Sequence, residues 1–66
     1  MKYEGQYENG KMNGEGILYY RYSGYINYIG YFKEGKKEGQ GKEFDKFGNL
    51  IYEGLFIDDK RASKII

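Results

Sequence analysis

The sequence predicts an all-β protein, an antiparallel meander of five to six strands in a single-layer twisted sheet. Three observations predict this fold. Short segments alternate between polar and apolar residues with a period of two, glycine-containing turns separate these segments, and a unit of 24 or 25 residues recurs along the chain. The expected structure contains no helix longer than one turn.

The first predicted hairpin begins with Tyr3–Tyr7, which alternates as a strand does. Asn9-Gly10 follows, and this pair is the strongest short signal for a two-residue type I′ turn. Opposite residues of an antiparallel pair share a face, so the hairpin brings aromatic residues and glycines to one side. The predicted opposite pairs are Tyr7–Met12, Gly5–Gly14 and Tyr3–Gly16.

The later elements follow the same logic. Glu34-Gly35 predicts the tip of a second hairpin, Ser23-Gly24-Tyr25 a three-residue connecting loop, and Gly48-Asn49 a two-residue connecting turn. These connections would preserve the alternation of faces across the whole sheet. The predicted pairs between hairpins are Tyr20–Tyr28, Gly16–Phe32 and Gly41–Phe56.

The recurring unit has its own signature. A tyrosine, a glycine and an aromatic residue stand at every second position, and further glycines follow in the first two copies. We assign residues 1–66 to one domain, with repeats at about 3–27 and 28–51 and a partial repeat at 52–66. The positions that define the repeat are Tyr3, Gly5, Tyr7, Gly14, Gly16, Tyr28, Gly30, Phe32, Gly39, Gly41, Tyr52, Gly54 and Phe56.

The segments YEGQYENGKMNGEG (3–16) and YIGYFKEGKKEGQG (28–41) resemble MORN repeats, whose pattern is Tyr-x-Gly-x-aromatic-x-x-Gly-x-x-x-Gly-x-Gly. The segment GKEFDKFGNLIYEGLFIDDK (41–60) is more similar to the variant MORN repeats of bacterial proteins. The resemblance covers nearly the whole chain. It implies β-hairpins that stack into an elongated single-layer sheet, with a scaffolding or binding role and no catalysis.

The two predicted faces of the sheet differ in composition. On the aromatic face, the rings of the repeat lie over glycines, whose missing side chains leave room for them, and we interpret this face as the core. The alternation places further residues there: Met12, Leu18, Tyr20, Tyr22, Ile26, Phe47 and Leu50. The second face carries the candidate interface residues Ile17, Tyr19, Ile29, Tyr31, Phe44, Ile51, Leu55 and Ile57.

A single-layer sheet cannot hide apolar residues on both faces by itself. We therefore expect a second copy of the chain to cover the second face. A different protein partner is the next alternative, and harmless exposure is the third. Both predicted sheet edges, residues 2–7 and the RASKII tail (61–66), carry Lys or Arg, which guard against uncontrolled pairing. Edge-to-edge joining into a longer sheet also stays open.

Composition argues against several classes of function. The chain has no Cys and no His, which removes disulfides, the usual zinc ligands and the common nucleophile–base pairs, so we expect no enzyme, metal or cofactor. The net charge of +1 comes without a basic stripe, so we expect no nucleic-acid partner. Without an apolar run of membrane-spanning length or a signal-peptide pattern, a cytoplasmic location is expected.

These observations favour a stand-alone protein-binding module. We expect it to self-associate, with a dimer favoured, and to block or sequester a protein partner, as an antitoxin, an immunity protein or a phage inhibitor does. The first alternative is a scaffold at a membrane surface or on phospholipids, although the densest basic patch is only KEGKK (33–37). The second is an oligomeric sponge for a small molecule, with aromatic residues of two subunits lining the pocket.

Overall fold

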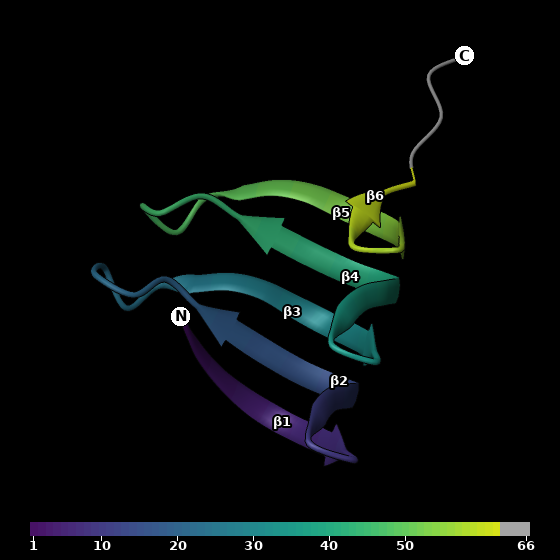
Figure 1. Ribbon diagram of the computed structural model, residues 1–66. Coiled ribbons are helices and arrows are strands. Elements are labelled where there is room, and N and C mark those ends of the chain that lie inside the picture. The colour runs from purple at the N-terminus through teal and green to yellow at the C-terminus, as the bar shows by residue number, and fades with distance from the viewer. Residues whose placement is uncertain (63–66) are drawn as a thin grey trace.

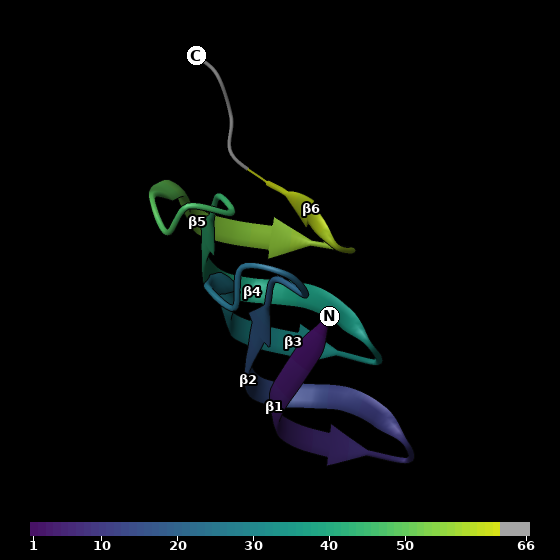
Figure 2. The same cartoon turned by 90° about the vertical axis from the view of Figure 1, so that its left-hand side faces the viewer.

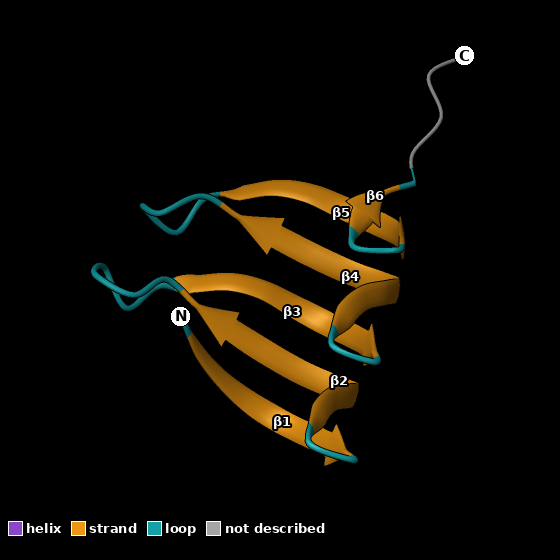
Figure 3. Cartoon of the chain, viewed as in Figure 1, coloured by secondary structure: helices purple, strands orange, loops and turns teal. Residues whose placement is uncertain are grey.

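The computed structural model describes residues 1–62 and shows six antiparallel strands in one open sheet (Figure 1). Strands adjacent in the chain are adjacent in the sheet, and the described residues contain no helix (Figure 3), so none could cross a membrane. The extents of 38 × 27 × 12 Å are those of a single layer. The predicted meander is therefore confirmed. Its strands are β1 (Lys2–Glu8), β2 (Lys11–Tyr19), β3 (Ile26–Lys33), β4 (Lys36–Phe44), β5 (Leu50–Ile57) and β6 (Lys60–Arg61).

Three hairpin tips lie at the same end of the sheet (Figure 2). Both residues of each tip have positive φ, as a type I′ turn requires: 53° and 79° at Asn9-Gly10, and 51° and 83° at Glu34-Gly35. The two predicted tips are therefore confirmed. The third tip, Asp58-Asp59, has φ values of 54° and 75° without any glycine, because aspartate tolerates this region better than most residues.

The predicted register of the first hairpin is right only beside its tip. Tyr7 lies opposite Met12 as expected, but Gly5 lies opposite Gly16, so the predicted pairs Gly5–Gly14 and Tyr3–Gly16 are wrong. The cause is a bulge in β2, where Gly14 has a φ of 91°. The second hairpin has the same bulge at Gly39, with a φ of 87°. These two glycines serve the bulges rather than the space beneath the rings.

The two connecting loops are also longer than predicted. The Tyr20 N–H donates to the Tyr25 carbonyl at 2.8 Å, which encloses four residues rather than Ser23-Gly24-Tyr25 alone. The Asp45 N–H donates to the Asn49 carbonyl at 2.8 Å, which encloses three residues rather than Gly48-Asn49. The predicted Tyr20–Tyr28, Gly16–Phe32 and Gly41–Phe56 pairs are therefore wrong, and the observed pairs include Leu18–Tyr28, Gly16–Gly30, Gly39–Phe56 and Gly41–Gly54.

The corrected register places the glycines of the repeat opposite one another in a continuous row across five strands. The row consists of Gly5, Gly16, Gly30, Gly41 and Gly54. Most register errors amount to two residues, and because side chains alternate with a period of two, these shifts keep the residues on their predicted faces.

The strands are curved (Figure 1). The tyrosine rings lie over the glycine row, which places them inside this bend. The Tyr28 hydroxyl donates to the carbonyl of Tyr31 at 2.8 Å, and Tyr3 reaches Gln6 in the same way at 2.7 Å. A tyrosine spans this distance along its own strand only if the strand turns toward the ring. The second face is consequently the outer side of the bend.

The bend allows one layer to form a core. Tyr28, Phe32 and Phe56 are 0%, 4% and 1% exposed. The Tyr28 ring meets those of Phe32 and Phe56 edge-on, with centroids 5.0 Å apart in both cases. Burial raises the pKa of the Tyr28 phenol to about 12, so it stays neutral at ordinary pH. Partly buried residues complete the cluster: Tyr3, Met12, Leu18 and Tyr52.

The predicted aromatic core is therefore right at its centre and wrong at its periphery. Tyr22 and Phe47 were expected on the same face but are 93% and 70% exposed, because both lie in the connecting loops rather than in strands. Leu50, at the start of β5, is 50% exposed.

A partly buried ion pair covers the core at its edge. The Lys37 ammonium lies 5.1 Å from the Tyr28 ring centroid and 3.2 Å from a Glu43 carboxylate oxygen. The Arg61 guanidinium donates to the other oxygen of Glu43 at 2.6 Å. Burial of this carboxyl opposes ionisation, but the hydrogen bonds from Arg61 and Lys37 outweigh it and hold the pKa of Glu43 below its ordinary value of 4.5.

This arrangement predicts how stability depends on acid. A lowered folded-state pKa gives stability that is present above pH 4.5 and is lost as the pH falls through the folded-state value. Glu43→Gln should therefore be less stable than the wild type at neutral pH, and the gap should narrow on acidification. Urea titrations from pH 7 downward measure this difference in the free energy of unfolding. The contributions of the other carboxylates to its pH dependence cancel, because both proteins have them. A gap that stays constant with pH would contradict the role given to Glu43.

Candidate functional site

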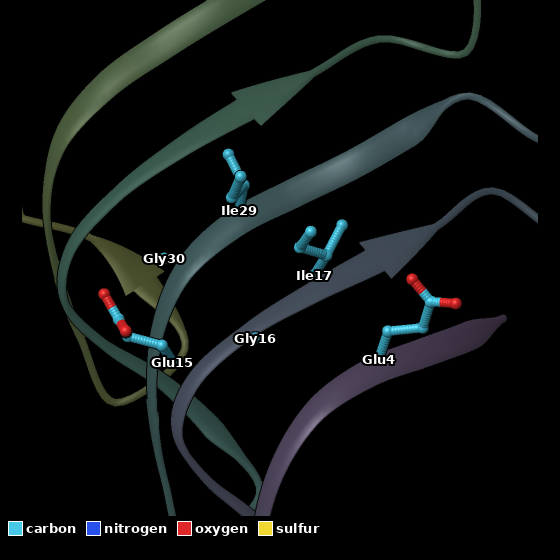
Figure 4. Close-up of a pocket in the computed structure, with 6 residues that line it drawn as sticks. All are labelled: Glu4, Glu15, Gly16, Ile17, Ile29 and Gly30. Atoms are coloured by element: carbon cyan, nitrogen blue, oxygen red, sulfur yellow. The ribbon is translucent and has the colours of Figure 1, made fainter.

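The second face presents a row of side chains that crosses the sheet beside the glycine row. Paired positions on five consecutive strands define it as Glu4, Ile17, Ile29, Lys42 and Glu53. Figure 4 shows Glu4, Ile17 and Ile29 standing on three neighbouring strands on the same side of the sheet. The row therefore has an aliphatic centre and charged ends.

Two shallow hollows lie along this row, and Ile29 forms the wall between them. Backbone at Gly16 and Gly30 lines the first hollow, together with Ile17 and two glutamates (Figure 4). The second hollow is lined by Gly41, Gln40 and the charged pair Lys42 and Glu53. The glycine row, which accommodates the rings on the aromatic face, thus also lines recesses in the second face.

The predicted interface residues fall into two groups in the structure. Ile17 and Ile29 are cross-strand neighbours and are half-buried. Tyr31 and Leu55 lie opposite Glu15 and Gln40, toward the tips, and are 46% and 52% exposed. The remaining members are more dispersed. Ile57, 59% exposed, stands next to the third tip, while Tyr19, Phe44 and Ile51 lie toward the connecting loops, where the register shifts interrupt the alternation.

Charged contacts fix one corner of the second face. The Tyr19 hydroxyl donates to a Glu4 carboxylate oxygen at 2.9 Å, and the Lys2 ammonium lies 3.4 Å from the other oxygen. The hydrogen bond from Tyr19, followed by the interactions with Lys2, lowers the pKa of Glu4. The carboxylate at this end of the row therefore stays ionised at neutral pH.

The second face offers aliphatic contacts and scattered charged groups. Its aliphatic side chains are flanked by single charges of both signs. Residues 1–62 contain no group of three His, Cys, Asp or Glu side chains placed to hold a metal. Aliphatic contacts surrounded by polar groups are typical of a surface that docks on a protein.

A second exposed surface, at the connecting loops, was missed by the sequence prediction. Tyr22 and Phe47 project from the two loops, and Tyr25 and Met1 are 54% and 67% exposed. Met1, Tyr22 and Lys46 line one hollow together with Arg21. We call these six residues the loop surface. The signal that could have identified it is a basic residue directly beside each exposed ring, Arg21 beside Tyr22 and Lys46 beside Phe47. The sequence prediction instead continued the strand alternation into the loops, which placed both rings in the core.

The MORN repeat family model matches residues 3–21 and 28–45, which together are more than half of the chain. The chain therefore belongs to the MORN-repeat family. MORN repeats commonly bind proteins or membrane lipids, and the family is one of binding modules. No curated protein and no solved structure matches this chain.

The two matched segments lie within the predicted repeats at 3–27 and 28–51. They begin at Tyr3 and Tyr28, two of the three tyrosines whose rings lie over the glycine row. The outer limits of the repeats and the assignment of residues 1–66 to one domain stay predictions.

Proposed function

We propose that this protein is a non-enzymatic binding module that docks on a protein through its second face. One observation carries the proposal: on the outside of the bend, Tyr31, Leu55 and Ile57 are each about half exposed in a sheet only one layer thick. The first repeat has Glu4 and Gln6 on this face, so the fold does not require apolar residues there. Their presence in later repeats is explained by a partner that covers them.

The same face supports self-association. A two-fold axis parallel to the strands, between β2 and β3, would place Ile17 of one copy against Ile29 of the second. It would also place Glu4 against Lys42 of the second copy, at both ends of the contact. Complementary charges around an apolar centre favour this register over others. A dimer and a docked protein partner would use the same surface, so the two states would compete.

A surface of this kind acts by occlusion. The second face has broad apolar contacts and shallow hollows, and its charged residues are dispersed along the strands. Binding would cover a region of the partner without altering it chemically. We therefore propose that the protein blocks or sequesters its partner, as an antitoxin or a phage-type inhibitor does, in the cytoplasm.

Affinity capture with the full chain tests the docking surface. Ile29→Lys with Leu55→Lys should lose the protein partners that the wild type retains, because both changes put charges into the proposed contact. A matched control, Tyr22→Lys with Ser23→Lys, adds the same charge at the connecting loop and should retain them. Equal capture by all three proteins would contradict docking through the second face.

A second candidate function is attachment to a membrane surface, and the loop surface favours it. Tyr22 and Phe47 are 93% and 70% exposed, and Arg21 and Lys46 are their neighbours in the chain. Aromatic rings beside basic residues suit the region between lipid headgroups and acyl chains. The charge is small, so the rings rather than Arg21 and Lys46 would have to provide most of the affinity.

Vesicle flotation tests this candidate. With phosphatidylserine-containing vesicles, Tyr22→Ala with Phe47→Ala should reduce the membrane partition coefficient by about a hundredfold or more, since burying each of the two side chains is worth about 1.5–3 kcal/mol. The control Ile29→Lys with Leu55→Lys should float like the wild type. If the wild type does not float, or if the loop variant floats equally well, the membrane candidate is wrong.

A further inference from the structure

The first strand, β1, forms an open edge of the sheet. β1 and β6 lie at opposite edges (Figure 1), and within residues 1–62 no strand pairs with the outer side of β1. Residues 63–66 continue from Ala62, whose N–H donates to the Leu55 carbonyl of β5. Four residues span at most about 14 Å, whereas β5 and β1 are four strands apart, about 19 Å. The end of the chain therefore cannot reach along β1.

One aromatic ring on this edge lacks a neighbour that its equivalents have. Phe32 meets the ring of Tyr3 with centroids 5.3 Å apart, and Phe56 meets that of Tyr28 at 5.0 Å, so each packs against the tyrosine of the preceding repeat. Phe32 and Phe56 are 4% and 1% exposed. Tyr7 has the equivalent position in the first repeat, but among the described residues its ring meets only that of Tyr3, and it is 60% exposed. The edge at β1 thus leaves uncovered a ring that the repeat otherwise buries.

The sequence of β1 (KYEGQYE) is complementary to itself in the antiparallel direction. Gly5 is its central residue, with a tyrosine two positions away on each side and opposite charges at the two ends. Two copies paired about this glycine would place like faces together, because opposite residues of an antiparallel pair share a face. The resulting pairs are Lys2–Glu8, Tyr3–Tyr7, Glu4–Gln6 and Gly5–Gly5. Each end of the contact would carry an ion pair, and no like charges would meet.

We propose that a second copy of the chain pairs with the outer edge of β1 through its own β1, antiparallel and centred on Gly5. The two-fold axis would stand perpendicular to the sheet, so the aromatic faces would lie on the same side and the glycine row would continue from one copy into the other. Tyr3 of each copy would supply the ring that Tyr7 of the other lacks. Main-chain hydrogen bonds would join two six-stranded sheets into one.

The neighbouring registers are less favourable than this one. A centre at Glu4 would bring two Glu4 carboxylates together, and a centre at Gln6 would place Glu4 opposite Glu8 twice. Like charges directly opposite each other are destabilising. A shift by one residue would turn the aromatic faces of the two copies to opposite sides. The charges that guard this edge against unspecific pairing therefore permit one register.

This contact is separate from docking through the second face. It involves only the seven residues of β1 in each copy, so we expect a dissociation constant on the order of 1 mM. At tens of micromolar, the molar mass of the protein therefore reports contacts through the second face alone. Where both contacts form, dimers joined through the second face would be linked edge to edge into a longer sheet.

Disulfide capture tests the proposed register, because the chain has no cysteine of its own. Lys2→Cys and Glu8→Cys proteins, one of them isotopically labelled so that mass spectrometry distinguishes the dimers, are mixed at about 0.5 mM in a glutathione buffer. The register brings the two introduced thiols opposite each other, but it keeps thiols at the same position of two copies about 20 Å apart. The mixed dimer should therefore exceed either like dimer by about tenfold or more.

The second Lys2–Glu8 pair of the mixed dimer tests the role of charge. Glu8→Lys in the Lys2→Cys chain places two ammonium groups opposite each other and should reduce the yield of mixed dimer about fivefold. Adding Lys2→Glu to the Glu8→Cys chain makes the charges opposite again and should restore the yield. Ile29→Lys in both chains is the control for the second face and should leave the yield unchanged.

Three results would overturn the inference. The first is formation of mixed and like dimers in statistical proportions, and the second is failure of the reversed charges to restore the yield. The third is loss of the cross-link on Ile29→Lys, which would place the contact on the second face. Each of these results leaves docking through the second face untouched.

Discussion

Gly30→Val is expected to destabilise the protein by roughly 2 kcal/mol or more, enough to unfold a chain of this size in mild denaturant. A Cβ atom at this position would lie 2.5 Å from the Gln40 carbonyl oxygen, 2.6 Å from the Gly41 Cα and 2.7 Å from the Tyr28 hydroxyl oxygen. Two of these three atoms belong to backbone, which cannot rotate away. The branched side chain would therefore open the bend that encloses the Tyr28 ring.

Gly10→Ala is the matched control for this prediction. Gly10 also has special backbone geometry, with a φ of 79°, but a Cβ atom there would meet nothing within 4 Å. Its replacement should cost only about 1 kcal/mol, through the positive φ. Urea denaturation midpoints of the two variants and the wild type measure the contrast. If Gly30→Val proved as mild as Gly10→Ala, the packing of rings over a glycine row would be wrong.

Ile29→Lys with Leu55→Lys should convert a self-associated wild type into a monomer. Both side chains lie on the second face, in β3 and β5, and Leu55 is 52% exposed in the single chain. Burial of one such side chain is worth about 1.5–3 kcal/mol, and a lysine at position 29 would stand at the centre of the proposed two-fold contact, where its charge would have to be desolvated. Leu55, on β5, lies outside the four strands that face each other in this contact, so Ile29→Lys causes the dissociation and Leu55→Lys removes apolar surface that a protein partner would cover. Light scattering behind a sizing column gives the molar mass directly.

The control for charge is again Tyr22→Lys with Ser23→Lys, which should keep the mass of the wild type. If the wild type is a monomer at tens of micromolar, the proposal of self-association is wrong. The second face would then bind only a different protein. A double variant that keeps both the wild-type mass and its captured partners would show that the second face is harmless exposure.

The sequence by itself determined the order of the hairpins and the two faces of the sheet. Asn9-Gly10 and Glu34-Gly35 act locally, because positive φ at both residues of a tip is set by the residues themselves. The alternation within each strand is local as well. The alternation assigned side chains to the correct faces although the predicted register was wrong. Most register shifts amounted to two residues, which returns side chains to the same face.

Only the tertiary structure decided the register, because a glycine in a repeat has more than one possible role. Gly14 and Gly16 stand two residues apart with the same chemistry, yet Gly14 forms a bulge and Gly16 lies beneath a ring. The choice depends on which strand passes opposite, and no local pattern contains that information. Local patterns also could not fix where each connecting loop closes, and both loops are longer than the sequence predicted.

The burial of the aromatic residues depended on the bend in the same way. Tyr22 and Tyr28 are the same residue type six positions apart, and one is 93% exposed while the other is completely buried. Tyr28 is covered because its own strand turns at Gly30 and because Phe56, from a distant part of the chain, meets its ring. Burial results from contacts between segments that are far apart in sequence, so composition and alternation could identify an aromatic face but not the limits of its buried part.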